Sequence, residues 1–141
     1  FVTGYDRRAD QTPADGKLIL EGPHGPQADP IAEDASLLLE TSSGPVLILG
    51  CAHSGVLNII DHVKEKFALD RLHAVLGGTH LMFYAPEQVQ AAIDTFEAFE
   101  VKRVGVSHCT GPQAAMKLAQ HFGDRFQHSA AEPSTRTSGQ S

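Results

Sequence analysis

The chain has 141 residues, of which 41% are hydrophobic and 20% charged, and its formal net charge is −6. This length is sufficient for one domain with a buried core. The acidic balance argues against a surface for nucleic acid or anionic membranes, and the longest apolar runs are too short to span a bilayer. The two cysteines do not form the framework of a disulfide-rich secreted domain, so we expect reduced thiols in the cytoplasm.

The first part of the chain shows few regular signals. The stretch from Lys17 to Leu20 is a candidate short strand, whereas EGPHGPQADP (21–30) is rich in Pro and Gly and is expected to be loop, with His24 on its surface. Regular patterns begin near residue 34. The chain therefore divides into a loop-rich lead-in (1–33), a folded part (34–127) and a polar tail for which we expect disorder (128–141).

Apolar strands and helical stripes alternate through the folded part. Strands are expected at SLLLET (36–41), VLIL (46–49), LHAVL (72–76) and VKRVGV (101–106), the first two joined as a hairpin. Apolar residues recur at helical spacing in three segments, 56–67, 86–99 and 112–122. We expect Ser54 to cap the first helix, and Phe67 and Met116 to lie on buried helix faces. This alternation is typical of an α/β fold.

Three histidines follow three of the expected strands. They are His53 in GCAHSG, His80 in GGTHL and His108 in SHCTG. The carboxyl ends of parallel strands meet at one sheet edge, so neighbouring strands would bring these imidazoles together. Three neutral imidazoles bind a transition metal and leave a coordination position open for water or substrate. The pattern predicts a shared metal or ligand site. The simpler alternative is that each histidine is a hydrogen-bonded structural group.

The same loops contain further candidate residues. Ser54, Thr110 and Gly111 lie at expected helix starts, where backbone donors and the helix dipole favour an anion such as phosphate, so we assign them to substrate binding. Cys51 and Cys109 flank the histidines. We interpret them as packed thiols, with a cysteine nucleophile as the alternative. The Gly-x-Ser-x-Gly elbow of serine hydrolases is absent from the sequence.

The motifs ILGCAHSGVLNII, AVLGGTHL and VSHCTG, in this order, resemble the second half of a metallo-β-lactamase-fold metallo-hydrolase. More narrowly, they are similar to the dihydropterin ribofuranosyl-aminobenzene-phosphate synthase-like branch, and EDASLLLETSSGPVLIL resembles the strand pair before the first motif. The resemblance implies half of an αββα sandwich with a one- or two-metal centre at a sheet edge. It implies that His53 and His108 are metal ligands and that His80 lies near the usual position of a bridging carboxylate. Zinc is the expected metal, with iron or manganese as alternatives.

The resemblance also implies a hydrolase in which a metal-bound hydroxide attacks an ester or a phosphate-bearing, pterin-related small molecule. The sequence departs from the family in lacking the His-x-His-x-Asp-His motif that supplies the first ligands, and its polar tail stands where a final strand is expected. The chain begins with Phe1, and we interpret it as a carboxy-terminal half that is inactive alone. Its exposed sheet face would be covered by a second copy, by a separate amino-terminal half or by residues 1–33. Two other functions remain open, a non-catalytic interaction subunit and a phosphate-binding domain without metal.

Overall fold

The computed structural model describes residues 1–128, so the disorder expected for the polar tail lies outside the described residues except at His128. A five-stranded sheet has the order β3-β4-β5-β6-β7. Its strands are β3 (Ser36–Leu39), β4 (Val46–Leu49), β5 (Ala74–Gly77), β6 (Arg103–Val106) and β7 (Phe126–His128). β3 pairs antiparallel with β4, as the hairpin prediction required, and the remaining neighbours are parallel. The predicted α/β fold is confirmed.

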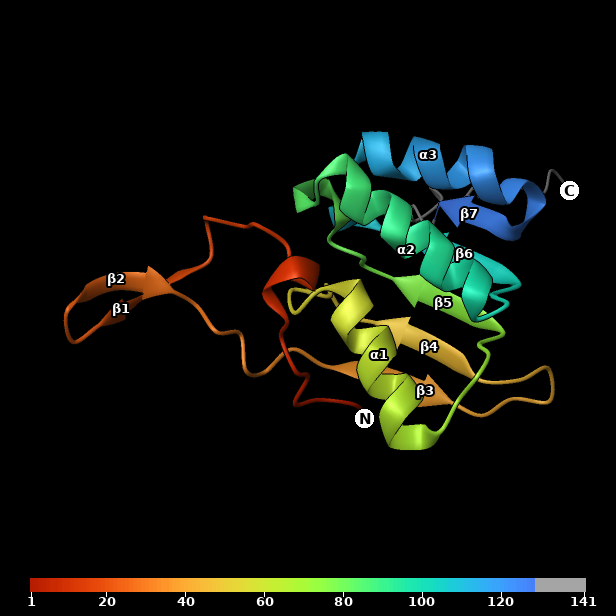
Figure 1. Ribbon diagram of the computed structural model, residues 1–141, viewed down its shortest axis with the longest axis horizontal. Coiled ribbons are helices and arrows are strands. Elements are labelled where there is room, and N and C mark those ends of the chain that lie inside the picture. Colours follow the sequence, from red (N-terminus) through yellow and green to blue (C-terminus); the bar gives the residue numbers. More distant parts are fainter. Residues whose placement is uncertain (129–141) are drawn as a thin grey trace, which may run out of the picture.

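Three helices cover one face of this sheet (Figure 1). They are α1 (Val56–Phe67), α2 (Pro86–Ala98) and α3 (Pro112–Phe122), and short 3-10 turns lie at η1 (Ala9–Gln11), η2 (Leu81–Phe83), η3 (His108–Thr110) and η4 (Gly123–Arg125). Leu47, Val75 and Val104 occupy one row across the central strands and are at most 1% exposed. The helices therefore bury this row and form a single core with it. Within residues 1–128, no helix is both long and apolar enough to cross a membrane.

The opposite face of the sheet is apolar and partly open. The strand register aligns Leu37, Ile48 and Leu76 in a row on that face, and each is only partly buried. Leu39, which points to the same side at the end of β3, is 39% exposed. Helices on one side and an apolar, partly exposed row on the other are the arrangement of half an αββα sandwich, as the sequence predicted.

The lead-in contains a hairpin of which the sequence predicted only part of the first strand. β1 (Ile19–Gly22) pairs antiparallel with β2 (Gly25–Ala28), and this hairpin projects away from the main sheet (Figure 1). The prediction that residues 21–30 are all loop was therefore wrong. Pro26 lies within β2, which is possible because a strand in a two-stranded sheet has a free edge where a missing N–H costs no ladder bond. His24 is exposed in the hairpin turn, as expected.

Three smaller predictions were also wrong, and one strand was not predicted. That strand, β7, pairs with β6, and its three residues are too short to give a periodic signal. Gly55, not Ser54, is the N-cap of α1, with φ 93 and no capping side chain. Phe67 and Met116 are 41% and 60% exposed. Phe67 ends α1, and Met116 lies off the stripe that α3 buries at Ala114, Leu118 and Phe122.

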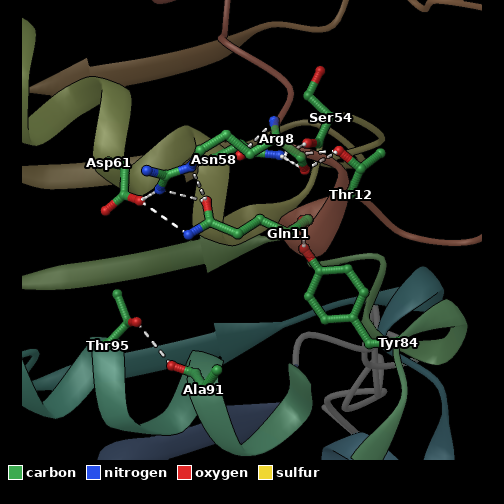
Figure 2. A network of polar contacts seen from close by, with 9 residues as sticks. All are labelled: Arg8, Gln11, Thr12, Ser54, Asn58, Asp61, Tyr84, Ala91 and Thr95. Atoms are coloured by element: carbon green, nitrogen blue, oxygen red, sulfur yellow. Dashed lines mark hydrogen bonds and ion pairs between the residues drawn. The ribbon is translucent and has the colours of Figure 1, made fainter. Parts of the chain in front are cut away.

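A polar network joins the lead-in to the body of the domain (Figure 2). Arg8 forms an ion pair with Asp61 of α1, and its backbone N–H donates to Asn58 Oδ1 at 3.2 Å. Asn58 Nδ2 in turn donates to the Ser54 carbonyl at 2.8 Å. The Tyr84 hydroxyl donates to the backbone carbonyl of Gln11, which lies three residues after Arg8 in the same segment. These contacts hold the amino-terminal segment against the same sheet edge that carries the three histidines.

Glu97 of α2 links three elements and should make stability dependent on pH. It pairs with Arg125 in η4 and with His121 in α3. The pKa of Glu97 is lowered, first by the hydrogen bond from Arg125 and then by His121. A carboxyl pKa that is lower in the folded state contributes stability above the unfolded value of about 4.3, and this contribution is lost as the pH falls through the folded pKa. We therefore expect Glu97→Gln to be less stable than wild type at neutral pH and to lose less stability on acidification.

Thermal unfolding followed by circular dichroism between about pH 7 and pH 3 tests this expectation. Glu65→Gln removes the same charge from an exposed position of α1 and should leave the pH dependence of the wild type unchanged. Parallel pH profiles for Glu97→Gln and wild type would show that the pairing adds no stability.

Candidate metal centre

The three predicted histidines lie at the carboxyl ends of three adjacent parallel strands. His53 follows β4, His80 lies between β5 and η2, and His108 begins η3 after β6. These strands are neighbours in the sheet, which is the condition for the three histidines to meet. Their loops therefore share one sheet edge, and the side chains there form two adjoining groups.

His53 and His80 form the first group. Their ring centroids are 4.6 Å apart and the ring planes lie at 80°. His80 is 5% exposed, and its ring packs on Phe83 at a centroid distance of 4.6 Å. Its Nε2 lies 3.1 Å from Asp15 Oδ2, whereas Nδ1 is buried and has no hydrogen-bond partner among the described residues. This buried ring nitrogen is therefore available to bind an ion or a water molecule.

The surroundings of His80 favour its neutral form. Burial lowers the pKa of His80, and the hydrogen bond to Asp15 opposes that shift without reversing it. A neutral imidazole is the form that binds a metal ion. His80 also has a φ of 53, in the left-handed region that few non-glycine residues occupy. Such a conformation costs about 1–3 kcal/mol and is typical of residues held in place for a function.

His108 belongs to a second group with the two cysteines. His108 Nε2 lies 3.3 Å from Cys51 Sγ, and the ligand atoms of Cys51, His108 and Cys109 all lie within 4.8 Å of one another. Cys109 is buried, and burial raises the pKa of its thiol. The structure thus brings His53 to His80 and brings His108 to the cysteines. Sequence reasoning treated these cysteines as packed thiols, although their positions beside His53 and His108 were a signal for a shared site.

The residues assigned to substrate binding occupy different environments. Thr110 is 1% exposed and its hydroxyl lies 2.8 Å from that of Thr79. Gly111 and Thr110 line a cavity of about 410 Å³ between η2 and the start of α3. Ser54 is 2% exposed, and its backbone N–H donates to Asp34 Oδ2 at 2.8 Å. Ser54 therefore anchors the loop that carries His53, whereas Thr110 and Gly111 face the cavity.

Asp15 and Asp34 are the carboxylates of the site. Asp34 accepts a hydrogen bond from the Ser54 backbone N–H and so holds the Ser54 loop. Asp15 comes from the lead-in, 65 positions before His80, and no pattern in the sequence connects them. The side chains of His80 and Asp15 are 6% and 9% exposed, so this is an enclosed pair.

Comparison with known proteins supports the architecture. No family model matches the chain. A solved structure described as a metal-dependent hydrolase of the beta-lactamase superfamily superposes with a TM-score of 0.76 and 27% identity, covering 90% of this chain and 48% of that one. The chain has a metallo-β-lactamase-type fold. The resemblance to this superfamily is therefore confirmed.

Two curated relatives come from Methanocaldococcus jannaschii. One is 7,8-dihydropterin-6-methyl-4-(beta-D-ribofuranosyl)-aminobenzene-5'-phosphate synthase, 25% identical over 99 residues that make up 70% of this chain and 34% of that protein. The other is an uncharacterized protein, 29% identical over 116 residues, 82% of this chain and 39% of that protein. The chain thus spans less than half the length of the relatives that it matches.

The donor atoms at the carboxyl edge of the parallel strands suit a transition-metal ion. The imidazoles of His53, His80 and His108 and the thiols of the two cysteines are nitrogen and sulfur ligands, which zinc and similar ions prefer. The Asp15 carboxylate contacts Nε2 of His80, and Nδ1 of the same ring has no hydrogen-bond partner among the described residues. A metal-ligating histidine almost always has its second nitrogen bound in this way.

Proposed function

We propose that this chain is the metal-carrying portion of a metal-dependent hydrolase of the metallo-β-lactamase superfamily. The observation that supports this most directly is the buried His80 beside His53 at the carboxyl edge of the parallel strands, with its Nε2 against Asp15 and its Nδ1 without a partner among the described residues. Ligands in open α/β sheets bind at this edge.

In this proposal His53 and His80 would hold an ion from the loops after β4 and β5, and His108 would bind metal from η3, on the adjoining side of a one- or two-metal centre. Zinc is the expected metal, with iron or manganese as alternatives. A divalent ion there lowers the pKa of bound water and polarises a substrate oxygen. Asp15 fixes the tautomer and the orientation of His80. The ring of His80, whose backbone is left-handed, lies against the ring of His53.

The substrate would occupy the cavity beside this edge. Its walls include the apolar side chains of Leu81, Tyr84 and Val89 and the amine-bearing Lys117, with Thr110 and Gly111 at the end near η3. An apolar wall with one cation suits a small molecule that combines a flat ring with an anionic group. An ester or a phosphate-bearing, pterin-related compound has this character, and the name of one curated relative contains both a pterin and a phosphate. Thr110 and Gly111 would contact the substrate directly, and Ser54 would act through the position of its loop.

The metal content of the purified protein tests the proposal. We expect wild type to retain divalent metal after gel filtration and His53→Ala to retain less than wild type, because one ligand is removed. His24→Ala removes an exposed imidazole in the β1–β2 turn and should retain wild-type metal content. A metal content of His53→Ala equal to that of wild type, measured by plasma emission spectroscopy, would contradict the assignment.

The open sheet face supports a second candidate function, that of an interaction subunit. The partly exposed row of Leu37, Ile48 and Leu76 is the surface that another layer of a sandwich would cover. Such a partner would be a separate amino-terminal half or a second copy of this chain. The mass in solution distinguishes the two functions: a metal-free dimer favours the interaction subunit, and a metal-loaded monomer opposes it.

A further inference from the structure

We propose that Cys51, Cys109 and His108 form a thiolate-rich binding site for a zinc-type ion, beside the His53–His80 pair. The resemblance to metallo-hydrolases implies histidine ligands at this edge and says nothing of cysteine ligands. The inference goes beyond the proposed function, because it assigns two cysteines to metal binding and predicts a soft ion on the His108 side.

The distances match the geometry of a tetrahedral ion. With Zn–S bonds of about 2.3 Å and Zn–N bonds of about 2.0–2.1 Å, the ligand atoms lie about 3.5–3.8 Å apart. The observed separation of Cys51 Sγ and His108 Nε2 is 3.3 Å, and all three ligand atoms lie within 4.8 Å of one another. The three ligand atoms therefore already lie near the separations of a tetrahedral site.

The backbone around Cys109 is built for the close approach of its sulfur atom. The His80 N–H donates to Cys109 Sγ at 3.4 Å, a contact that stabilises negative charge on sulfur. Gly78 leaves the space for this thiol, since a Cβ at that position would lie 2.7 Å from Cys109 Sγ and 2.5 Å from the Gly50 carbonyl.

Access and charge also suit the site. Cys109 is buried, Cys51 is partly exposed and His108 is exposed, so the group opens to solvent on one side. An ion entering from that side displaces one proton from each thiol to solvent, and two thiolates then neutralise its two positive charges. Thiolate and imidazole together select zinc-type ions over magnesium or calcium. Three protein ligands leave one position open.

Titration of the purified, fully reduced protein with Co²⁺ tests the inference. A phosphine reductant keeps the thiols free without competing as a thiol ligand. We expect a near-ultraviolet sulfur-to-cobalt charge-transfer band that saturates with one ion, is weaker in Cys51→Ser and is absent in Cys51→Ser/Cys109→Ser. His53→Ala should retain this band, because its imidazole belongs to the other group. Circular dichroism establishes that each variant is folded, and Cys51→Ser is the variant least able to disturb the core because Cys51 is partly exposed.

Saturation by Co²⁺ without a charge-transfer band, or an unchanged band in the double variant, would overturn the thiolate site. Either result leaves the proposed function standing if the metal content still depends on His53. Loss of the charge-transfer band only in His53→Ala would also overturn the inference. Retention of the band in His53→Ala and His80→Asn, with a weaker band in His108→Ala and its loss in the double cysteine variant, would support the thiolate site and separate it from the histidine pair.

Discussion

Gly77→Ala is expected to destabilise the domain by more than about 3 kcal/mol, because two unfavourable effects coincide at the end of β5. Gly77 has a φ of +114, a conformation that side chains rarely adopt. A Cβ there would lie 2.2 Å from the Leu49 carbonyl oxygen and 3.1 Å from its carbon, both backbone atoms of the neighbouring strand. Since Gly77 pairs with Leu49 and Val106, relief of this overlap would separate β5 from β4 where the candidate metal centre begins.

Gly44→Ala provides the matched control for backbone strain. Gly44 lies in the β3–β4 turn with a φ of +121, yet the atom nearest to a Cβ there would be the Cβ of His73 at 3.4 Å, an ordinary contact. Denaturant unfolding of the two variants should therefore give a much larger loss of unfolding free energy for Gly77→Ala. Equal losses would indicate that conformational strain alone acts at Gly77, without the steric overlap with β4.

The main sheet and its helices were predictable because each has a periodic apolar pattern. The apolar runs located β4, β5 and β6 to within a few residues, and Pro86 and Pro112 marked the first turns of α2 and α3. β7 was missed because a three-residue strand has no period to detect. β1 and β2 were partly missed because their glycines and prolines favour turns, and the hairpin forms in spite of that preference.

The location of the candidate site was predictable, but its pairwise contacts were not. Parallel strands fix which loops share an edge, and glycines beside His53, His80 and His108 showed where backbones approach closely. Which side chains then meet depends on loop conformation. The left-handed backbone at His80 turns its ring toward His53, and η3 places His108 against Cys51. Asp15 reaches the site across 65 positions of sequence, a distance over which local pattern carries no information.

Loss of the His80 imidazole should have the largest effect on metal binding in the protein. We expect His80→Asn to lower zinc affinity more than about 100-fold, because it removes a ligand and not only the group that orients it. Asn tolerates the left-handed region better than most residues, so this variant preserves the backbone that φ 53 requires. The measurement is competition for zinc against a chromophoric chelator at neutral pH.

Asp15→Asn should produce a smaller loss, about 10–100-fold, because it removes the charge that orients His80 and leaves the ligand in place. Protonation does not explain such a loss. Asp15 opposes the lowering of the His80 pKa, so its replacement moves that pKa further down and keeps the imidazole neutral. Asp10→Asn makes the same charge change at an exposed position of η1 and should bind zinc as wild type does.

The order of the three zinc affinities shows whether Asp15 positions His80. If Asp15 positions His80, zinc affinity falls in the order wild type, Asp15→Asn, His80→Asn. Equal affinity in wild type and Asp15→Asn would show that the contact between Asp15 and His80 only fixes the lead-in to the domain. A further test follows from the same contact, because Asp15 belongs to the lead-in and His80 to the sheet edge. Bound zinc should then protect the lead-in from proteolysis in wild type and protect it less in Asp15→Asn, since only the wild-type carboxylate connects the ion to that segment through His80.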